Sequence, residues 1–114
     1  MSTVDRQPQR LEFLQGTLDV LILRSLRLSS NHAYGIGQFL EQQSGQEFVV
    51  DNGSLYPALQ RLLLSEFVEA EWGVTENNRR ARYYRITEAG KKQLEQEKRS
   101  FEFLLAGIAR VMEA

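Results

Sequence analysis

The sequence contains no cysteine and only one histidine, His32. Disulfide bonds, iron–sulfur clusters and thiolate-rich zinc sites are therefore excluded, and a zinc or nucleophilic site lacks its usual side chains. Gly35 and Gly37 do not form a phosphate loop, because no Gly-Lys-Ser/Thr follows them. We therefore expect neither enzyme activity nor a cofactor, and we expect His32 to be a solvent-facing loop residue.

Long apolar stretches are also missing. No run approaches the roughly 20 residues that span a bilayer. The opening segment MSTVDRQPQR lacks the apolar core of a secretory signal, and we interpret residues 1–10 as a flexible arm. These absences predict a cytoplasmic protein without a membrane partner.

Neither sign of charge dominates, but the charges are unevenly distributed. The formal net charge is −1, which by itself counts weakly against nucleic-acid binding. Residues 78–92, however, contain six cations and one anion, so this window carries +6 − 1 = +5. The length of 114 residues and the 42% hydrophobic content suit one folded domain.

Apolar residues at helical spacing predict three helices in the first half of the chain. The first is firm over residues 17–28, with Thr17 as its N-cap. The second covers residues 34–44 and ends at Gly45. The third begins near Ser54, after EFVV, a segment compatible with a very short strand.

Two short runs rich in aromatic and β-branched residues, FVEAEWGV and ARYYRIT, predict a β-hairpin with a polar tip. Alternation along these runs favours hairpin-core positions for Trp72 and Tyr84 rather than a role in ligand stacking. Opposite charges on the facing strands are candidates for ion pairs, namely Arg82 and Arg85 with Glu69 or Glu71.

A last helix, capped by Thr87 and with Glu88 in its first turn, carries an apolar stripe of its own. Nothing else in the sequence remains to cover this stripe, so we expect it to form the seam of a homodimer. A seam containing Phe101 either packs tightly or leaves a cavity for a flat hydrophobic effector. The expected seam residues are Leu94, Phe101, Leu104, Leu105, Ile108 and Val111.

The order helix, helix, helix, hairpin, long helix predicts a mainly α fold of the α+β type, a winged helix-turn-helix with a C-terminal dimerisation helix. We divide the chain into an arm (1–10), a winged helix-turn-helix domain (11–87) and the dimerisation helix (88–114). In such folds the third helix enters the major groove of DNA.

The third helix begins with DNGSLYPALQRL, in which a proline and polar residues interrupt an apolar pattern. If Ser54 is the N-cap, Pro57 falls in the first turn, where a helix tolerates proline. Both residues then either contact DNA or only mark the helix start. The side chains expected to face DNA are Ser54, Tyr56, Pro57, Gln60 and Arg61.

The hairpin tip and the start of the second helix supply further candidates. Asn78, Arg79 and Arg80 lie at the tip, where guanidinium groups either reach phosphates and a minor groove or remain solvated. Tyr34 opens the second helix, where its hydroxyl bonds a phosphate or its ring packs on the third helix.

Four segments resemble the PadR family of bacterial transcriptional regulators: GTLDVLILRSL, AYGIGQFLEQQSG, NGSLYPALQRLLLSEFVEAEW and NNRRARYYRITEAGKKQL. The resemblance implies a homodimeric repressor of pseudo-palindromic, double-stranded operator DNA, which some members release on binding a small aromatic effector. It also implies contacts to DNA by Ser54, Tyr56 and Pro57 on the reading helix, by Tyr34 to a phosphate, and by Arg79 and Arg80 in the wing.

The chain departs from the family pattern at one turn. The usual glycine between the third helix and the wing is absent, so Ser65 or Glu66 must form this turn. Two other functions remain open. The acidic balance is compatible with a winged-helix protein-interaction module, and the aromatic residues are compatible with a ligand-sequestering dimer.

Overall fold

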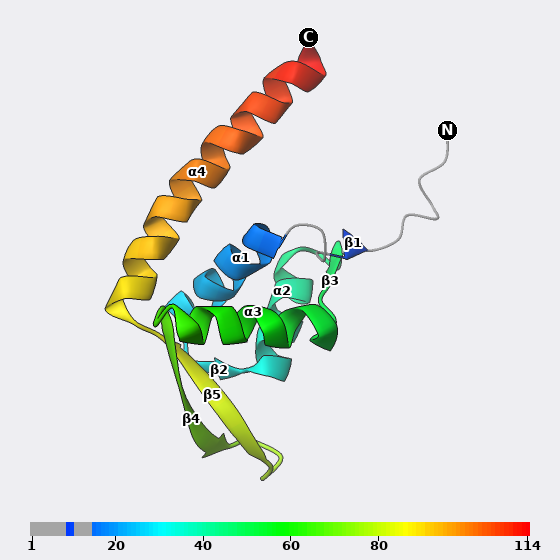
Figure 1. Ribbon diagram of the computed structural model, residues 1–114. Helices are drawn as coiled ribbons and strands as arrows, with labels where there is room; N and C mark the ends of the chain where they lie inside the picture. Colours follow the sequence, from blue (N-terminus) through cyan, green and yellow to red (C-terminus); the bar gives the residue numbers. More distant parts are fainter. Residues whose placement is uncertain (1–8, 11–14) are drawn as a thin grey trace.

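Three short helices form the body of the molecule, and a β-hairpin projects from it. A long helix begins at the root of the hairpin and extends in the opposite direction (Figure 1). The computed structural model describes residues 9–10 and 15–114. Of the predicted arm, residues 1–8 lie outside the described residues. The helices are α1 (Gln15–Leu28), α2 (Ala33–Gln43), α3 (Asn52–Leu64) and α4 (Glu88–Glu113). The strands are β1 (Gln9–Arg10), β2 (Asn31–His32), β3 (Phe48–Val49), β4 (Val68–Val74) and β5 (Arg80–Ile86).

The strands form two small sheets. In the larger, β5 pairs antiparallel with both β2 and β4, giving the order β2-β5-β4. In the smaller, β1 pairs parallel with β3, the very short strand that EFVV suggested. The order of helices and hairpin confirms the predicted winged helix-turn-helix, and β2 attaches the wing (β4, β5 and their connecting turn) to the start of α2.

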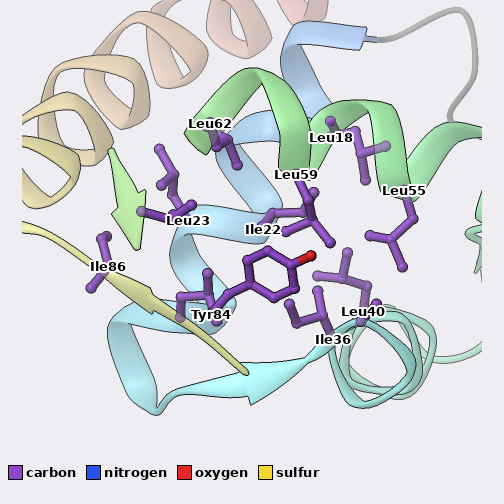
Figure 2. Close-up of a cluster of buried hydrophobic side chains, with 14 of the residues drawn as sticks. Leu18, Ile22, Leu23, Ile36, Leu40, Leu55, Leu59, Leu62, Tyr84 and Ile86 are labelled. Atoms are coloured by element: carbon purple, nitrogen blue, oxygen red, sulfur yellow. The ribbon is translucent and has the colours of Figure 1, made fainter. Parts of the chain in front are cut away.

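Side chains from α1, α2, α3 and β5 close a single apolar core (Figure 2). Ile22 and Ile36 are fully buried, and Leu59 is 1% exposed. Tyr84 points from the wing into this cluster and is 5% exposed, so its predicted core position is confirmed. Burying a side chain of this size contributes about 1.5–3 kcal/mol. The wing is therefore fixed to the helices at its root.

Trp72 does not share this core, and its side chain is 60% exposed. The register pairs Val68 with Ile86 at the buried root and Trp72 with Arg82 four residues further out. At roughly 3.3 Å per residue, Trp72 lies about 13 Å beyond that root. The predicted core position of Trp72 is wrong because the helices cover only the base of the hairpin.

The start of α2 depends on His32. This residue has extended backbone, and its Nδ1 accepts a hydrogen bond of 3.1 Å from the Gly35 N–H. The imidazole is half-buried and meets the Tyr83 ring edge-on, with 5.3 Å between the ring centroids. The prediction of a solvent-facing loop residue is therefore wrong. His32 is an N-cap, held between the helix and the wing.

The start of α3 depends on Asp51 rather than on Ser54. The Asp51 carboxylate accepts a hydrogen bond of 2.9 Å from the Ser54 N–H. Counting from Asn52, Ser54 is the third helical residue and Pro57 the sixth, in the second turn. Asp51 prevails because a carboxylate caps as well as a hydroxyl and also interacts favourably with the helix dipole. The prediction of Ser54 as N-cap is wrong.

Residues with a left-handed backbone conformation follow the ends of α2 and α3. Gly45 has φ +68° after α2, as predicted, and Glu66 has φ +61° after α3. The N–H groups of Glu66 and Phe67 each donate a 3.0 Å hydrogen bond back to α3 carbonyls. Glu66 thus forms the turn for which no glycine is present. At the other end of the body, α1 begins at Gln15, so Thr17 lies inside the helix rather than at its N-cap.

The root of α4 is held by close contacts with the turn that follows α3. The Thr87 hydroxyl accepts from the Gly90 N–H at 3.0 Å, as the capping prediction requires, and donates to the Glu66 carbonyl at 2.8 Å. A Cβ at position 90 would collide with the Phe67 carbonyl oxygen. Leu94 is only 3% exposed and belongs to the core. Its assignment to the dimer seam is therefore corrected: the first turns of α4 pack on the body.

Candidate nucleic-acid interface

A hollow of about 1160 Å³ lies between the start of α2, the exposed side of α3 and the wing. Three elements that are distant in the sequence contribute polar and aromatic side chains to it. Its lining includes Tyr34 and Gln38 from α2, Tyr56 and Gln60 from α3, and Trp72, Arg79, Arg80 and Arg82 from the wing.

The α2 contribution is the pair Tyr34 and Gln38. Tyr34 is 72% exposed, and its hydroxyl accepts a 3.2 Å hydrogen bond from the Gln38 side-chain amide. A ring so exposed does not pack on α3, which removes one of the two alternatives for Tyr34. The hydroxyl retains its own proton for donation to an acceptor such as a phosphate oxygen.

The α3 contribution is Tyr56 and Gln60, one helical turn apart on the face opposite the buried leucines. Tyr56 is 52% exposed, whereas Leu55 and Leu59 are each 1% exposed. Ser54 is half-buried and Pro57 exposed, but neither lines the hollow. Of the residues predicted for the reading helix, the structure thus brings Tyr56 and Gln60 to the hollow.

Arg61 points away from this surface. Its Nη2 lies 2.7 Å from Asp19 Oδ1 and its Nε 3.3 Å from Asp19 Oδ2, so the guanidinium binds α1 through two parallel contacts. Arg61 does not line the hollow. The prediction that Arg61 faces DNA is corrected, because two of its donors bind Asp19 on α1, 42 positions earlier in the chain.

The wing tip is a tight turn. Asn78 has φ +60°, a conformation that asparagine tolerates, and its N–H donates to the Thr75 carbonyl at 2.9 Å. The Thr75 N–H in turn donates to the Arg79 carbonyl at 2.8 Å. Arg79 is exposed and lines the hollow, as does Arg80, whose guanidinium carbon lies 4.6 Å from the centroid of the Trp72 ring.

The two faces of the wing differ in charge. Arg85 binds Glu69 and Glu71, as predicted, and the hydrogen bond with Glu69 raises the pKa of Arg85 above its ordinary value. Arg82 does not join these carboxylates. Its guanidinium carbon lies 6.0 Å from the Tyr84 ring centroid, on the side of the hollow. Sequence reasoning did not assign Arg82 to the site, although its spacing of two from Arg80 places both on one face of a strand.

Three helices followed by a wing, with a shared hollow between them, define a winged helix-turn-helix protein. The model of the family described as "Transcriptional regulator PadR-like family" matches residues 22–96. The chain therefore belongs to the PadR-like family, and it is a transcriptional regulator rather than an enzyme.

The chain is also similar to individual proteins. An uncharacterized protein from Lysinibacillus sphaericus is 33% identical over 85 residues, which are 75% of this chain and 78% of the relative. A transcriptional regulator from Clostridium thermocellum has a similar structure, with a TM-score of 0.78, 26% identity, and coverage of 86% of this chain and 95% of that one. A PadR-like transcriptional regulator from Bacillus cereus gives a TM-score of 0.75 at 26% identity, covering 90% and 97% of the two chains.

The part of the chain that the structure describes contains neither a membrane-spanning helix nor a cluster of metal ligands. No helix there combines the length and the apolar character needed to cross a membrane. No group of three histidine, aspartate or glutamate side chains there is arranged to hold a metal ion.

Proposed function

We propose that this protein is a homodimeric repressor that binds pseudo-palindromic, double-stranded operator DNA. In this proposal α3 enters the major groove and the wing contacts the flanking backbone. The observation that carries it is the hollow, in which groups from α2, α3 and the wing converge on one surface. A transcriptional regulator acts at the chromosome, so the proposed location is the cytoplasm.

The chemistry of the hollow suits DNA. Tyrosine hydroxyls and guanidinium groups bind phosphate oxygens, and glutamine amides bond the edge of adenine in the major groove. We assign Gln60 and Tyr56 to the groove, Tyr34 to a phosphate, and Arg79 and Arg80, next to Asn78 at the tip, to the backbone beside it. Ser54 and Pro57, at the entrance of α3, are retained as secondary contacts.

The far end of α4 supports the dimer. The C-terminal part of α4 extends away from the body (Figure 1), and most of its apolar side chains are exposed, among them Leu104 at 56% and Ile108 at 50%. Such a stripe is typical of a helix that packs against a second copy. The proposed seam consists of Phe101, Leu104, Leu105, Ile108 and Val111. Two α3 helices then engage half-sites about 34–36 Å apart.

The same seam supports control by a small aromatic effector. Apolar and aromatic side chains from two copies of α4 provide the surroundings that a flat hydrophobic molecule needs. Binding between the helices would change their relative angle, and with it the spacing of the two reading helices.

A duplex-binding assay across salt concentrations tests the proposal. A protein with 6–10 phosphate contacts loses about 10³–10⁵ in affinity between roughly 50 and 200 mM salt. We expect a loss of that order, together with a preference for a duplex selected from genomic DNA over a random one. Binding that ignores salt, or that shows no preferred duplex, would favour a protein-interaction module instead.

A further inference from the structure

The inner face of the wing, which carries Trp72, Arg80, Arg82 and Tyr84, is cationic. Strand pairing places Val74 opposite Arg80 and Trp72 opposite Arg82, so these side chains share one face. Glu69 and Glu71 lie on the other face, where they neutralise Arg85. Among the residues that the structure describes, neither Arg80 nor Arg82 has a carboxylate partner. One carboxylate, Glu76, does line the hollow, at the wing tip.

Both guanidinium groups of the inner face lie over aromatic rings. Arg80 is the closer, at 4.6 Å from the Trp72 centroid, against 6.0 Å for Arg82 and Tyr84. Stacking covers a face of the planar guanidinium, whereas its N–H donors point outward in the plane. An arginine held in this way remains able to donate two parallel hydrogen bonds to a phosphate.

Packing in the core does not explain why a tryptophan stands at position 72, because Trp72 is not part of the core. The indole is 60% exposed, diagonal to Arg80 across the hairpin, and lines the hollow. The contact that the structure gives its ring is the guanidinium of Arg80, which lies over it. Restricting a flexible arginine before binding reduces the entropy lost when it contacts a ligand.

We propose that Trp72 is a positioning residue for DNA binding: its ring holds the Arg80 guanidinium over the inner face of the wing, ready to bind a backbone phosphate. This inference rests on the proposed function and deepens it. Arg80 makes the contact, and Trp72 acts through Arg80 rather than on DNA itself.

A double-mutant cycle on a selected duplex, repeated across salt concentrations, tests the inference in the full-length protein. We expect Arg80→Ala to weaken binding about tenfold and to reduce the salt slope by about one phosphate contact. We expect Trp72→Ala to weaken binding about threefold with an unchanged slope, because the charge is still present. Trp72→Phe, which keeps an aromatic face, should restore most of the loss.

The decisive comparison is Trp72→Ala in the Arg80→Ala background, where we expect no further loss. An equal loss in both backgrounds would overturn the inference, because Trp72 would then act on DNA directly or only through stability. Unfolding temperatures of all variants should match the wild type, since both side chains are exposed. A large drop for Trp72→Ala would show a structural role and would also overturn the inference.

Arg85→Ala is the matched control, because it removes the same charge from the other face of the same hairpin. We expect its affinity to remain within about twofold of the wild type. If wild-type binding is salt-dependent but Arg80→Ala has no effect, the inference fails while the proposed function stands. If the wild type prefers no duplex, the proposed function fails, and the inference fails with it.

Discussion

A bidentate ion pair between Arg61 and Asp19 joins α3 to α1. Each side chain is about one third exposed or less. Because the geometry is bidentate and partly buried, we expect Arg61→Ala to lower the free energy of unfolding by about 1 kcal/mol. Urea unfolding measures this change. The salt slope of DNA binding should not change, because the Arg61 guanidinium binds Asp19 and does not line the hollow.

Gln60→Ala is the matched control on the neighbouring position of α3. The exposed Gln60 lines the hollow, so its loss should leave unfolding unchanged and weaken binding to the preferred duplex by about 1–3 kcal/mol. A result in which Arg61→Ala alters the salt slope and Gln60→Ala alters stability would reverse the assignment of the two side chains.

Asp51 caps α3 in the structure. If Ser54 were the cap instead, the relative cost of replacing the two residues would be reversed. We expect Asp51→Ala to destabilise the protein by about 1 kcal/mol, because the Ser54 N–H loses its acceptor. Ser54→Ala should cost distinctly less. Thermal unfolding of the two variants decides the order, and a larger cost at Ser54 would show that the cap lies there.

The root of α4 links the body of the protein, which carries the hollow, to the proposed seam. Gly90 packs directly on the Phe67 carbonyl and on Ile86, so a methyl group there has no space. We expect Gly90→Ala to destabilise the protein by about 1–3 kcal/mol, measured by urea unfolding.

Gly107 is the matched position further along α4, where a Cβ would meet nothing within 4 Å in the protomer. Since alanine favours a helix over glycine by about 0.5–1 kcal/mol, Gly107→Ala should stabilise the helix. Equal destabilisation by both substitutions would mean that neither effect depends on the close contact at position 90.

The first turn of α4 contains a pH-dependent contact. The hydrogen bond that Glu88 accepts from Lys91, 3.0 Å long, lowers the pKa of Glu88. A carboxylate whose pKa is lowered by folding stabilises the protein above its unfolded pKa, and this contribution disappears as the pH falls through the folded value. We expect Glu88→Gln to reduce the unfolding temperature slightly at pH 7 and not at about pH 2. An equal reduction at both pH values would exclude this ion pair as the cause.

At the scale of the whole molecule, α4 has two apolar surfaces with different roles. Leu94 belongs to the protomer core, whereas Ile108 belongs to the exposed stripe. We expect Ile108→Asp to yield folded monomers in analytical ultracentrifugation, with operator affinity reduced because the two half-sites are no longer bound together.

Leu94→Asp provides the contrast, since a carboxylate in the core should unfold the protomer itself. Circular dichroism distinguishes this outcome from dissociation. Dimers that persist in Ile108→Asp would place the interface on another surface.

Much of the architecture follows from local patterns. Helical spacing, turn residues and alternation act over a few neighbouring positions, which is why the helix order, the hairpin, the Thr87 cap and the buried Tyr84 were predictable. The N-cap of α3 was less predictable, because Asp51, Asn52 and Ser54 all favour that position and the pattern alone does not show that the helix begins directly after Asp51.

The failures concern distant contacts. Arg61 on α3 binds Asp19 on α1, a contact between two packed helices. Leu94 belongs to the core because the first turns of α4 pack on the body. Trp72 remains exposed because the helices cover only the base of the hairpin. The residues themselves were sufficient to predict a winged helix with a cationic wing and an apolar last helix, since composition and period are properties of the chain. Which arginines face the hollow, and which aromatic ring holds one of them, depends on the register of β4 with β5 and on packing between elements far apart in sequence.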